Sequence, residues 1–237
     1  MKPASGKGKS MKRDQDGNLI KLRHDKDGNP VIQRYTANER SNHWLTAICF
    51  IVLALTGLAM FHPAMSWLAL LFGGGQWTRI LHPFFGVVMF VSFMLLALRM
   101  RAHNKFEDGD KQWLKQIGDV LANREDKLPR IGKYNAGQKM LFFTLVVCMI
   151  VLLLSGIVIW RQWFSHFFPI GLIRFSSLMH AFFAFVIITA IIVHIYAGLW
   201  IKGSIGAMTR GFVSYGWARK HHPKWFEEVM KKGDSGH

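Results

Sequence analysis

Four long runs of uncharged, mostly apolar residues limit what this chain can fold into. They span Trp44–Phe61, Ile80–Leu98, Met140–Trp160 and Phe175–Ile201. Each is close to or above the ~18 residues that a helix needs to cross the hydrocarbon core of a bilayer. We therefore predict an all-α, polytopic membrane protein, a bundle of four transmembrane helices. Pro83 stands near the start of the second run, where we expect the first turn of a helix, the position that tolerates proline best.

The formal net charge of +16 would by itself suggest a nucleic-acid-binding protein, but the positions of the charges favour a membrane protein. Of the 30 Lys and Arg residues, ten lie in residues 1–42, ten in 99–139 and seven in 202–237, which leaves three for the other two loops. Cytoplasmic loops of membrane proteins are enriched in Lys and Arg. We therefore predict that both termini and the 99–139 loop are cytoplasmic, that the protein contacts lipid, and that it binds no nucleic acid.

The distribution of polar residues predicts three parts of the chain. Residues 1–38 form a basic cytoplasmic N-terminal extension, residues 39–205 the four-helix membrane domain, and residues 206–237 a basic cytoplasmic tail. Within the extension, the triplet DGN occurs twice, ending at Asn18 and at Asn29, and is typical of tight turns. A short hairpin and a disordered segment are equal alternatives there.

Two histidines lie within the last apolar run, 14 residues apart, at His180 and His194. In an α-helix, 14 residues turn through about 1400°, which is ~40° short of four full turns, and rise by ~21 Å. Both imidazoles therefore leave the same face of the predicted helix, one near each membrane surface. Ionisable side chains inside membrane spans are costly and usually functional.

Two further histidines stand at the depths that these two require. His43 precedes the first run at its cytoplasmic end, and His82 begins the second run at its outer end. The chain direction therefore pairs His43 with His194 on the cytoplasmic side, and His82 with His180 on the outer side. A haem with two axial histidines needs two neutral imidazoles that face each other at one depth. The four residues satisfy this condition twice, which predicts two b-type haems stacked across the membrane.

Other uses of histidines in helices fit the sequence less well. The two cysteines, Cys49 and Cys148, lie inside predicted spans and outside any C-x-x-C-H motif, so we expect the haems to be bound non-covalently. A proton-coupled transporter is the alternative from another functional class, but such proteins usually place carboxylates along the proton path. The four apolar runs contain no Asp or Glu.

A polar segment, Gly132–Lys139, directly precedes the third run on the cytoplasmic side. Asn135 and Gln138 have the spacing of a helix N-cap and its capping-box partner. A polar helix start at the depth of the inner haem also offers hydrogen bonds to the carbonyl groups of a quinone and a route for protons. We therefore consider both a cap and a quinone site here.

Several motifs together resemble one family. They are Asn42-His43-Trp44, the segment from Arg79 to Gly86, the segment Gly132–Lys139, Ile159-Trp160-Arg161, and Lys202-Gly203-Ser204-Ile205 followed by His221-His222-Pro223. Over roughly residues 38 to 230 the chain is similar to the membrane-embedded cytochrome b (gamma) subunit of respiratory formate dehydrogenases. The long basic N-terminal extension departs from the family's pattern.

The resemblance implies a set of ligands and partners. It assigns the outer haem to His82 and His180 and the inner haem to His43 and His194, and it implies a pocket for menaquinone, or another quinone, that involves His194. The partners that it implies are an iron–sulfur subunit and a catalytic subunit that holds molybdenum or tungsten, in the inner (cytoplasmic) membrane of a bacterium. Besides His194, the resemblance assigns Asn135, Gly137 and Gln138 to the quinone pocket.

These observations lead to one functional hypothesis and one close alternative. We expect electrons to enter at the outer haem from the iron–sulfur partner, to cross to the inner haem, and to reduce quinone with cytoplasmic protons, which contributes to the proton motive force. The chain itself carries no pattern of molybdenum or iron–sulfur ligands, so we expect no formate-oxidising site. The alternative is the cytochrome b subunit of a membrane hydrogenase or thiosulfate reductase, with the same helices and a different electron donor.

Overall fold

The computed structural model describes residues 12–13, 19–20, 22–25, 27–122, 124 and 128–234. The chain divides into two compact units. The first, which we call the bundle, consists of residues 37–99 and 140–202. The second, which we call the flanking unit, consists of the described parts of residues 1–36, 100–139 and 203–237.

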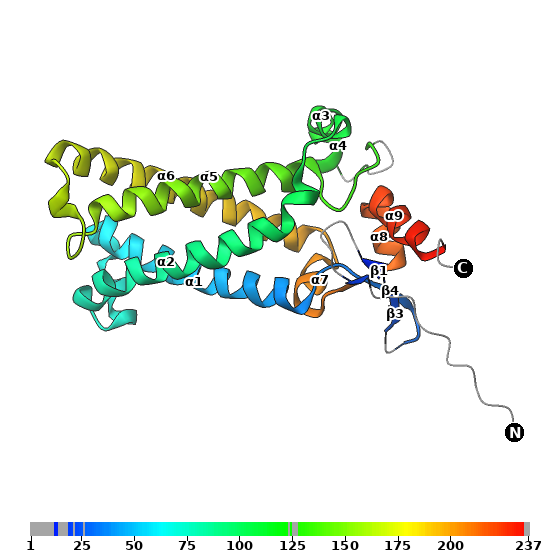
Figure 1. Ribbon diagram of the computed structural model, residues 1–237, viewed down its shortest axis with the longest axis horizontal. Helices are drawn as coiled ribbons and strands as arrows, with labels where there is room; N and C mark the ends of the chain where they lie inside the picture. The colour runs from blue at the N-terminus through cyan, green and yellow to red at the C-terminus, as the bar shows by residue number, and fades with distance from the viewer. Residues whose placement is uncertain are drawn as a thin grey trace, which may run out of the picture. The chain divides into compact units, whose positions relative to one another are not determined.

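Four long helices form the bundle and run side by side (Figure 1). They are α1 (Ala37–Phe61), α2 (Gly75–Met100), α5 (Ala136–Ile159) and α6 (Ile170–Trp200). All four are long and apolar enough to cross a membrane. The prediction of a mostly helical protein with four spans is therefore confirmed, and the structure adds a few short strands outside the bundle.

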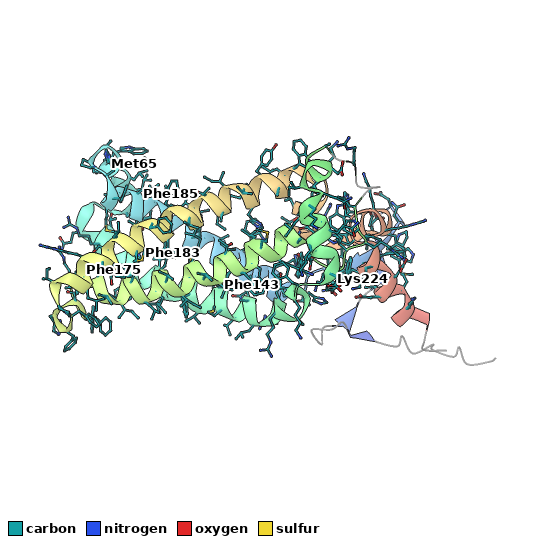
Figure 2. All side chains as sticks on the ribbon, turned by 90° about the horizontal axis from the view of Figure 1, so that it is seen from above. Met65, Phe143, Phe175, Phe183, Phe185 and Lys224 are labelled. Atoms are coloured by element: carbon teal, nitrogen blue, oxygen red, sulfur yellow. The ribbon has the colours of Figure 1, made fainter. Side chains whose placement is uncertain are left out.

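The bundle has a small buried core and exposes many large apolar side chains. Its core contains Cys49, Met89 and Cys148, each no more than 6% exposed. On the outside, Phe175 and Phe185 are 59% and 70% exposed, and Figure 2 shows the side chains that line the outer surface. Large exposed apolar side chains along whole helices are unfavourable in water and favourable in lipid.

The second helix begins earlier than its apolar run indicates. It starts at Gly75, so Pro83 lies inside the helix, and the prediction that Pro83 occupies the first turn is wrong. The 3₁₀ helix η1 (Pro63–Phe72) ends at Gly73 and Gly74, whose positive φ angles of 83° and 98° turn the chain directly into α2. Polar residues in the first turns of α2 concealed this start. Pro83 supplies no N–H for the carbonyl one turn before it, a break that the neighbouring helices have to offset.

A small antiparallel sheet forms part of the flanking unit. Strands β3 (Leu22–His24) and β4 (Pro30–Gln33) pair as a hairpin, and β5 (Phe212–Ser214) pairs with the other edge of β4. The second DGN triplet lies in the β3–β4 turn, where the Asp25 carboxylate accepts hydrogen bonds from the backbone N–H groups of Asp27 and Asn29. Strands β1 (Lys12–Arg13) and β2 (Leu19–Ile20) form a second pair. The first triplet, at residues 16–18, lies outside the described residues.

The remaining elements are short helices. In the flanking unit they are η2 (Arg101–Asn104), α3 (Asp108–Lys115), α4 (Ile117–Leu121), α7 (Ser204–Arg210), α8 (Tyr215–His221) and α9 (Pro223–Asp234), and in the bundle η4 (Ser165–Phe167). The N-terminal extension, the middle loop and the tail share one apolar core, to which they contribute Ile32, Tyr134 and Trp225, respectively. Three segments that are far apart in the sequence therefore fold as a single unit.

A buried arginine holds these three segments together. Arg34 is 4% exposed, and its Nη2 donates hydrogen bonds to the carbonyl of Lys133, at 2.6 Å, and to Nε2 of His222, at 3.1 Å. Its guanidinium carbon also lies 5.1 Å from the ring centres of both Trp217 and Trp225. Arginine stacks on aromatic rings and keeps its charge when buried. Nδ1 of His222 lies 2.8 Å from the carbonyl of Gly132, which can only accept, so this histidine is neutral with its proton on Nδ1.

The neutral state of His222 makes the flanking unit sensitive to acid. Burial first, and then the charge of Arg34, lower the pKa of His222 well below 6.5. The unfolded chain therefore binds more protons at this site, so the stability of the folded unit is complete above pH 6.5 and decreases as the pH falls below it. We expect amide hydrogen exchange over residues 212–229, corrected for intrinsic rates, to become faster between pH about 7.5 and about 5.5.

Two variants separate this effect from general acid sensitivity. His222→Gln keeps a donor for Gly132 and an acceptor for Arg34 but does not titrate, so the additional exchange at low pH should disappear. His221→Gln changes the neighbouring histidine and should retain it. Equal protection at both pH values in the unmodified protein would contradict the prediction.

Candidate functional site

The four histidines predicted to act together lie in the bundle as two facing pairs. His82 on α2 and His180 on α6 have ring centres 6.2 Å apart with planes inclined at 64°. His43 on α1 and His194 on α6 have ring centres 6.3 Å apart with planes inclined at 56°. His194 is exposed, and the other three side chains are partly buried.

These separations fit one iron ion between each pair of imidazoles. A metal ion about 2 Å from each ligating nitrogen, with about 1 Å from that nitrogen to its ring centre, separates two ring centres by about 6 Å. A structural metal site built by protein alone usually has four ligands. In the described parts of the chain, His, Cys, Asp and Glu side chains form no group of three or more suited to a metal. Pairs of histidines instead suit an iron whose other ligands come from a porphyrin.

The outer pair, His82 and His180, is held by two hydroxyl groups that the sequence analysis did not identify. Oγ1 of Thr56 lies 2.7 Å from Nδ1 of His82, and Oγ of Ser155 lies 3.0 Å from Nδ1 of His180. Thr56 is fully buried and Ser155 is 6% exposed. Each hydroxyl stands inside an apolar run, where a single Thr or Ser is a weak sequence signal. A bond to Nδ1 orients the imidazole and leaves Nε2 to face the opposite ring.

A glycine lies beside each ring of the outer pair. A Cβ atom at Gly57 would lie 3.4 Å from Cε1 of His82, and a Cβ atom at Gly156 would lie 3.4 Å from Cε1 of His180. Any side chain larger than alanine at either position would meet the imidazole. These two glycines therefore permit the close approach of α1 to His82 and of α5 to His180.

In the inner pair, His43 and His194, a polar contact between α1 and α2 fixes the turn that carries His43. Asn42 donates from Nδ2 to the carbonyl of Ser92, at 2.9 Å, and its Oδ1 accepts a hydrogen bond from the Ser92 hydroxyl, at 2.5 Å. The Thr46 hydroxyl lies 2.9 Å from the same Ser92 hydroxyl. Hydrogen bonds between helices in an apolar surrounding fix their register. The contact holds the first turns of α1 against α2, directly beside His43.

The start of α5 has the capping box that its sequence predicts. The backbone N–H of Gln138 donates to Oδ1 of Asn135 at 2.9 Å, and the backbone N–H of Asn135 donates to Oε1 of Gln138 at 3.0 Å. The capping interpretation of Asn135 and Gln138 is therefore confirmed. Gly137 lies between them under the ring of Trp113, where a Cβ atom would lie 3.1 Å from Cη2.

A buried ion pair adjoins this helix start within the flanking unit. Nζ of Lys139 lies 2.8 Å from Oδ2 of Asp110, and both side chains are 4% exposed. Asp110 also accepts a hydrogen bond from the backbone N–H of Glu107. The pair ties the first turn of α5 to α3, and buried charges of this kind require such partners.

Comparison with known proteins gives consistent matches over most of the chain. The family described as prokaryotic cytochrome b561 matches residues 34–211. The cytochrome b556(fdo) subunit of formate dehydrogenase from Escherichia coli (strain K12) is 47% identical over 201 residues, which cover 85% of this chain and 94% of the relative. The nitrate-inducible cytochrome b556(Fdn) subunit from the same strain is 45% identical, with 85% and 93% covered. The formate dehydrogenase cytochrome b556 subunit of Haemophilus influenzae is 45% identical over 202 residues, with 85% of each chain covered.

Proposed function

Because this chain belongs to the prokaryotic cytochrome b561 family, we propose that it is the di-haem cytochrome b subunit of a membrane-bound formate dehydrogenase. The chain is a multi-pass membrane protein of a cytochrome b family. The single observation that carries the proposal is the presence of two facing histidine pairs, with ring centres 6.2 and 6.3 Å apart, inside one bundle of apolar helices. The names of its relatives favour a formate dehydrogenase over a hydrogenase or a thiosulfate reductase.

The proposed ligands are divided between two depths of the bundle. His82 and His180 both stand in the first half of their helices, whereas His43 stands near the start of α1 and His194 near the end of α6. Adjacent antiparallel helices therefore place one pair toward each end of the spans. In this proposal each pair supplies the two axial ligands of one haem b, which carries one electron at a time.

The proposed direction of transfer follows from the positions of the charges. The basic segments at residues 1–42, 99–139 and 202–237 are assigned to the cytoplasm, which places His43 and His194 on the cytoplasmic side. Electrons then enter at His82 and His180 from an iron–sulfur subunit outside, next to a molybdenum or tungsten catalytic subunit. Their arrival on the inner side, together with proton uptake from the cytoplasm, contributes to the proton motive force.

The proposed quinone site is the polar start of α5. The side-chain amides of Asn135 and Gln138 and the free backbone N–H groups of a helix start are suitable hydrogen-bond partners for quinone carbonyls. Gly137 lies between them under the ring of Trp113, which covers this part of the backbone. Reduction takes two electrons, which the inner haem would supply one at a time, and two protons from the cytoplasm, and it forms the quinol.

The haem assignment predicts that the histidines act in pairs. Either His43→Ala or His194→Ala should remove the inner haem, and either His82→Ala or His180→Ala should remove the outer haem, because an iron that loses one axial imidazole is held much more weakly. Haem content per chain and low-spin absorption spectra of the four purified variants measure this. Retention of both haems in any one variant would contradict the assignment of that residue.

The topology predicts the location of two reporters. A reporter fused after Lys232, and one inserted within residues 105–125, should both behave as cytoplasmic, because both regions belong to the basic segments. An insertion after Gly74, in a loop with almost no Lys or Arg, should behave as periplasmic and serves as the control. A periplasmic signal from either of the first two would overturn the sidedness of both haem sites.

The quinone proposal and the capping role lead to different results for Asn135→Ala. Loss of the cap alone should cost about 0.5–2 kcal/mol of helix stability and leave the oxidation of reduced haem by quinone unchanged. A quinone site predicts slower haem oxidation by a menaquinone analogue in Asn135→Ala and in Gln138→Ala, at normal haem content. Asn135→Asp keeps the cap but changes the hydrogen bonds to quinone, and it should also react slowly. Unmodified rates in all three variants, measured by stopped flow, would leave only the cap.

A further inference from the structure

The two helix pairs of the bundle carry identical or similar residues at corresponding positions. Cys49, Thr56 and Gly57 on α1 correspond to Cys148, Ser155 and Gly156 on α5, each 99 positions later. On the following helices, Thr78 and His82 of α2 correspond to Ser176 and His180 of α6, each 98 positions later. The α1–α2 hairpin and the α5–α6 hairpin therefore carry matching residues at matching positions.

The repeated residues also have the same surroundings. Cys49 and Cys148 are 2% and 1% exposed, and Thr78 and Ser176 are 0% and 5% exposed. The two glycines stand at the same distance from Cε1 of their histidines, as described above. Each hairpin thus carries one complete half of the outer site, which consists of a histidine, a glycine that makes room for its ring, and a hydroxyl beside its Nδ1.

The hydroxyl groups determine which ring nitrogen carries the proton. A hydroxyl has one proton to donate, and a backbone carbonyl can only accept. Oγ1 of Thr56 lies 2.7 Å from the carbonyl oxygen of Val52, and Oγ of Ser155 lies 2.6 Å from that of Val151. Two oxygen atoms this close require a proton between them. Each hydroxyl therefore donates its only proton to the carbonyl one turn earlier. Toward its histidine it can act only as an acceptor, from Nδ1–H.

We propose that Thr56 and Ser155 are paired positioning residues that hold His82 and His180 in the tautomer with a free Nε2. The proposal rests on the proposed function, because Nε2 is the atom that would ligate the outer haem. The inner pair, His43 and His194, does not belong to this repeated set of histidine, glycine and hydroxyl. The positions equivalent to His43 and His194 are Phe142 and Leu96, and Nδ1 of His43 is buried without a hydrogen-bond partner among the described residues.

The two haems should therefore respond differently to loss of a hydroxyl. A hydrogen bond accepted from Nδ1–H makes the imidazole a stronger electron donor, which stabilises the oxidised iron and lowers its midpoint potential. Thr56→Val and Ser155→Ala remove these bonds without adding bulk. Each variant should raise the midpoint potential of the outer haem and change its low-spin electron paramagnetic resonance signal, and the double variant should shift the potential further. The inner haem should keep its potential.

Matched controls separate the hydrogen bond from the change of side chain. Thr189→Val and Ser177→Ala remove hydroxyls on α6 that donate to the carbonyl one turn earlier and contact no histidine, so both potentials should stay unchanged. Thr56→Ser and Ser155→Thr exchange each residue for its counterpart in the other hairpin and keep the hydroxyl. In both variants the outer haem should keep the midpoint potential of the unmodified protein. If Thr56→Val loses the outer haem altogether, retention of that haem in Thr56→Ser supports the role of the hydroxyl, and its loss in both contradicts that role.

One background variant keeps this test apart from that of the haem assignment. In His82→Ala, only the inner haem should remain, and adding Ser155→Ala should leave its potential unchanged. Two haems in His82→Ala would contradict the proposed function. One haem in His82→Ala, together with unchanged potentials and signals in Thr56→Val and Ser155→Ala, would contradict only the positioning role.

Discussion

An imidazole inside an apolar helix bundle needs a partner for each of its two nitrogen atoms, because an unsatisfied polar group there costs several kcal/mol. The bundle places a buried hydroxyl beside Nδ1 of His82 and another beside Nδ1 of His180. The second nitrogen of each imidazole, Nε2, is then left for the opposite ring and for a group that binds between the two rings. One hydroxyl from each hairpin therefore meets this requirement at Nδ1 of the outer pair, whereas Nδ1 of His43 is buried without a hydrogen-bond partner among the described residues.

The same requirement explains why the kinds of polar side chain that are buried differ between the two units. In the bundle, most hydroxyl groups bond to the carbonyl of the preceding turn or to a neighbouring helix, as Thr46 does with Ser92. Most buried charged residues lie in the flanking unit, where Arg34 lies between two tryptophans and Lys139 pairs with Asp110. In the bundle, Glu39 is buried in the first turn of α1, and the apolar runs that follow carry no Asp, Glu, Lys or Arg.

Sequence reasoning reached the features that depend on local pattern. Hydropathy located the four helices, a spacing of 14 residues placed His180 and His194 on one face, and the Asn135–Gln138 spacing identified a capping box that the structure confirms. It missed the start of α2, because the polar residues before Ile80 concealed the first five positions of this helix, residues 75–79. It missed Thr56 and Ser155, because a lone hydroxyl in an apolar helix normally needs no partner beyond its own preceding turn. It also did not anticipate that the extension, the loop and the tail share one core, since such contacts join distant parts of the chain.

The most direct test of this account is the number of haems that one chain binds. Two facing histidine pairs call for two non-covalent, low-spin b haems, each with two axial imidazoles. The purified protein should therefore contain two haems per chain in a pyridine haemochrome assay, extractable by acidified acetone, with a reduced-minus-oxidised spectrum of low-spin haem b. A haem-free protein, or one that binds a single haem under conditions that saturate the site, would contradict it.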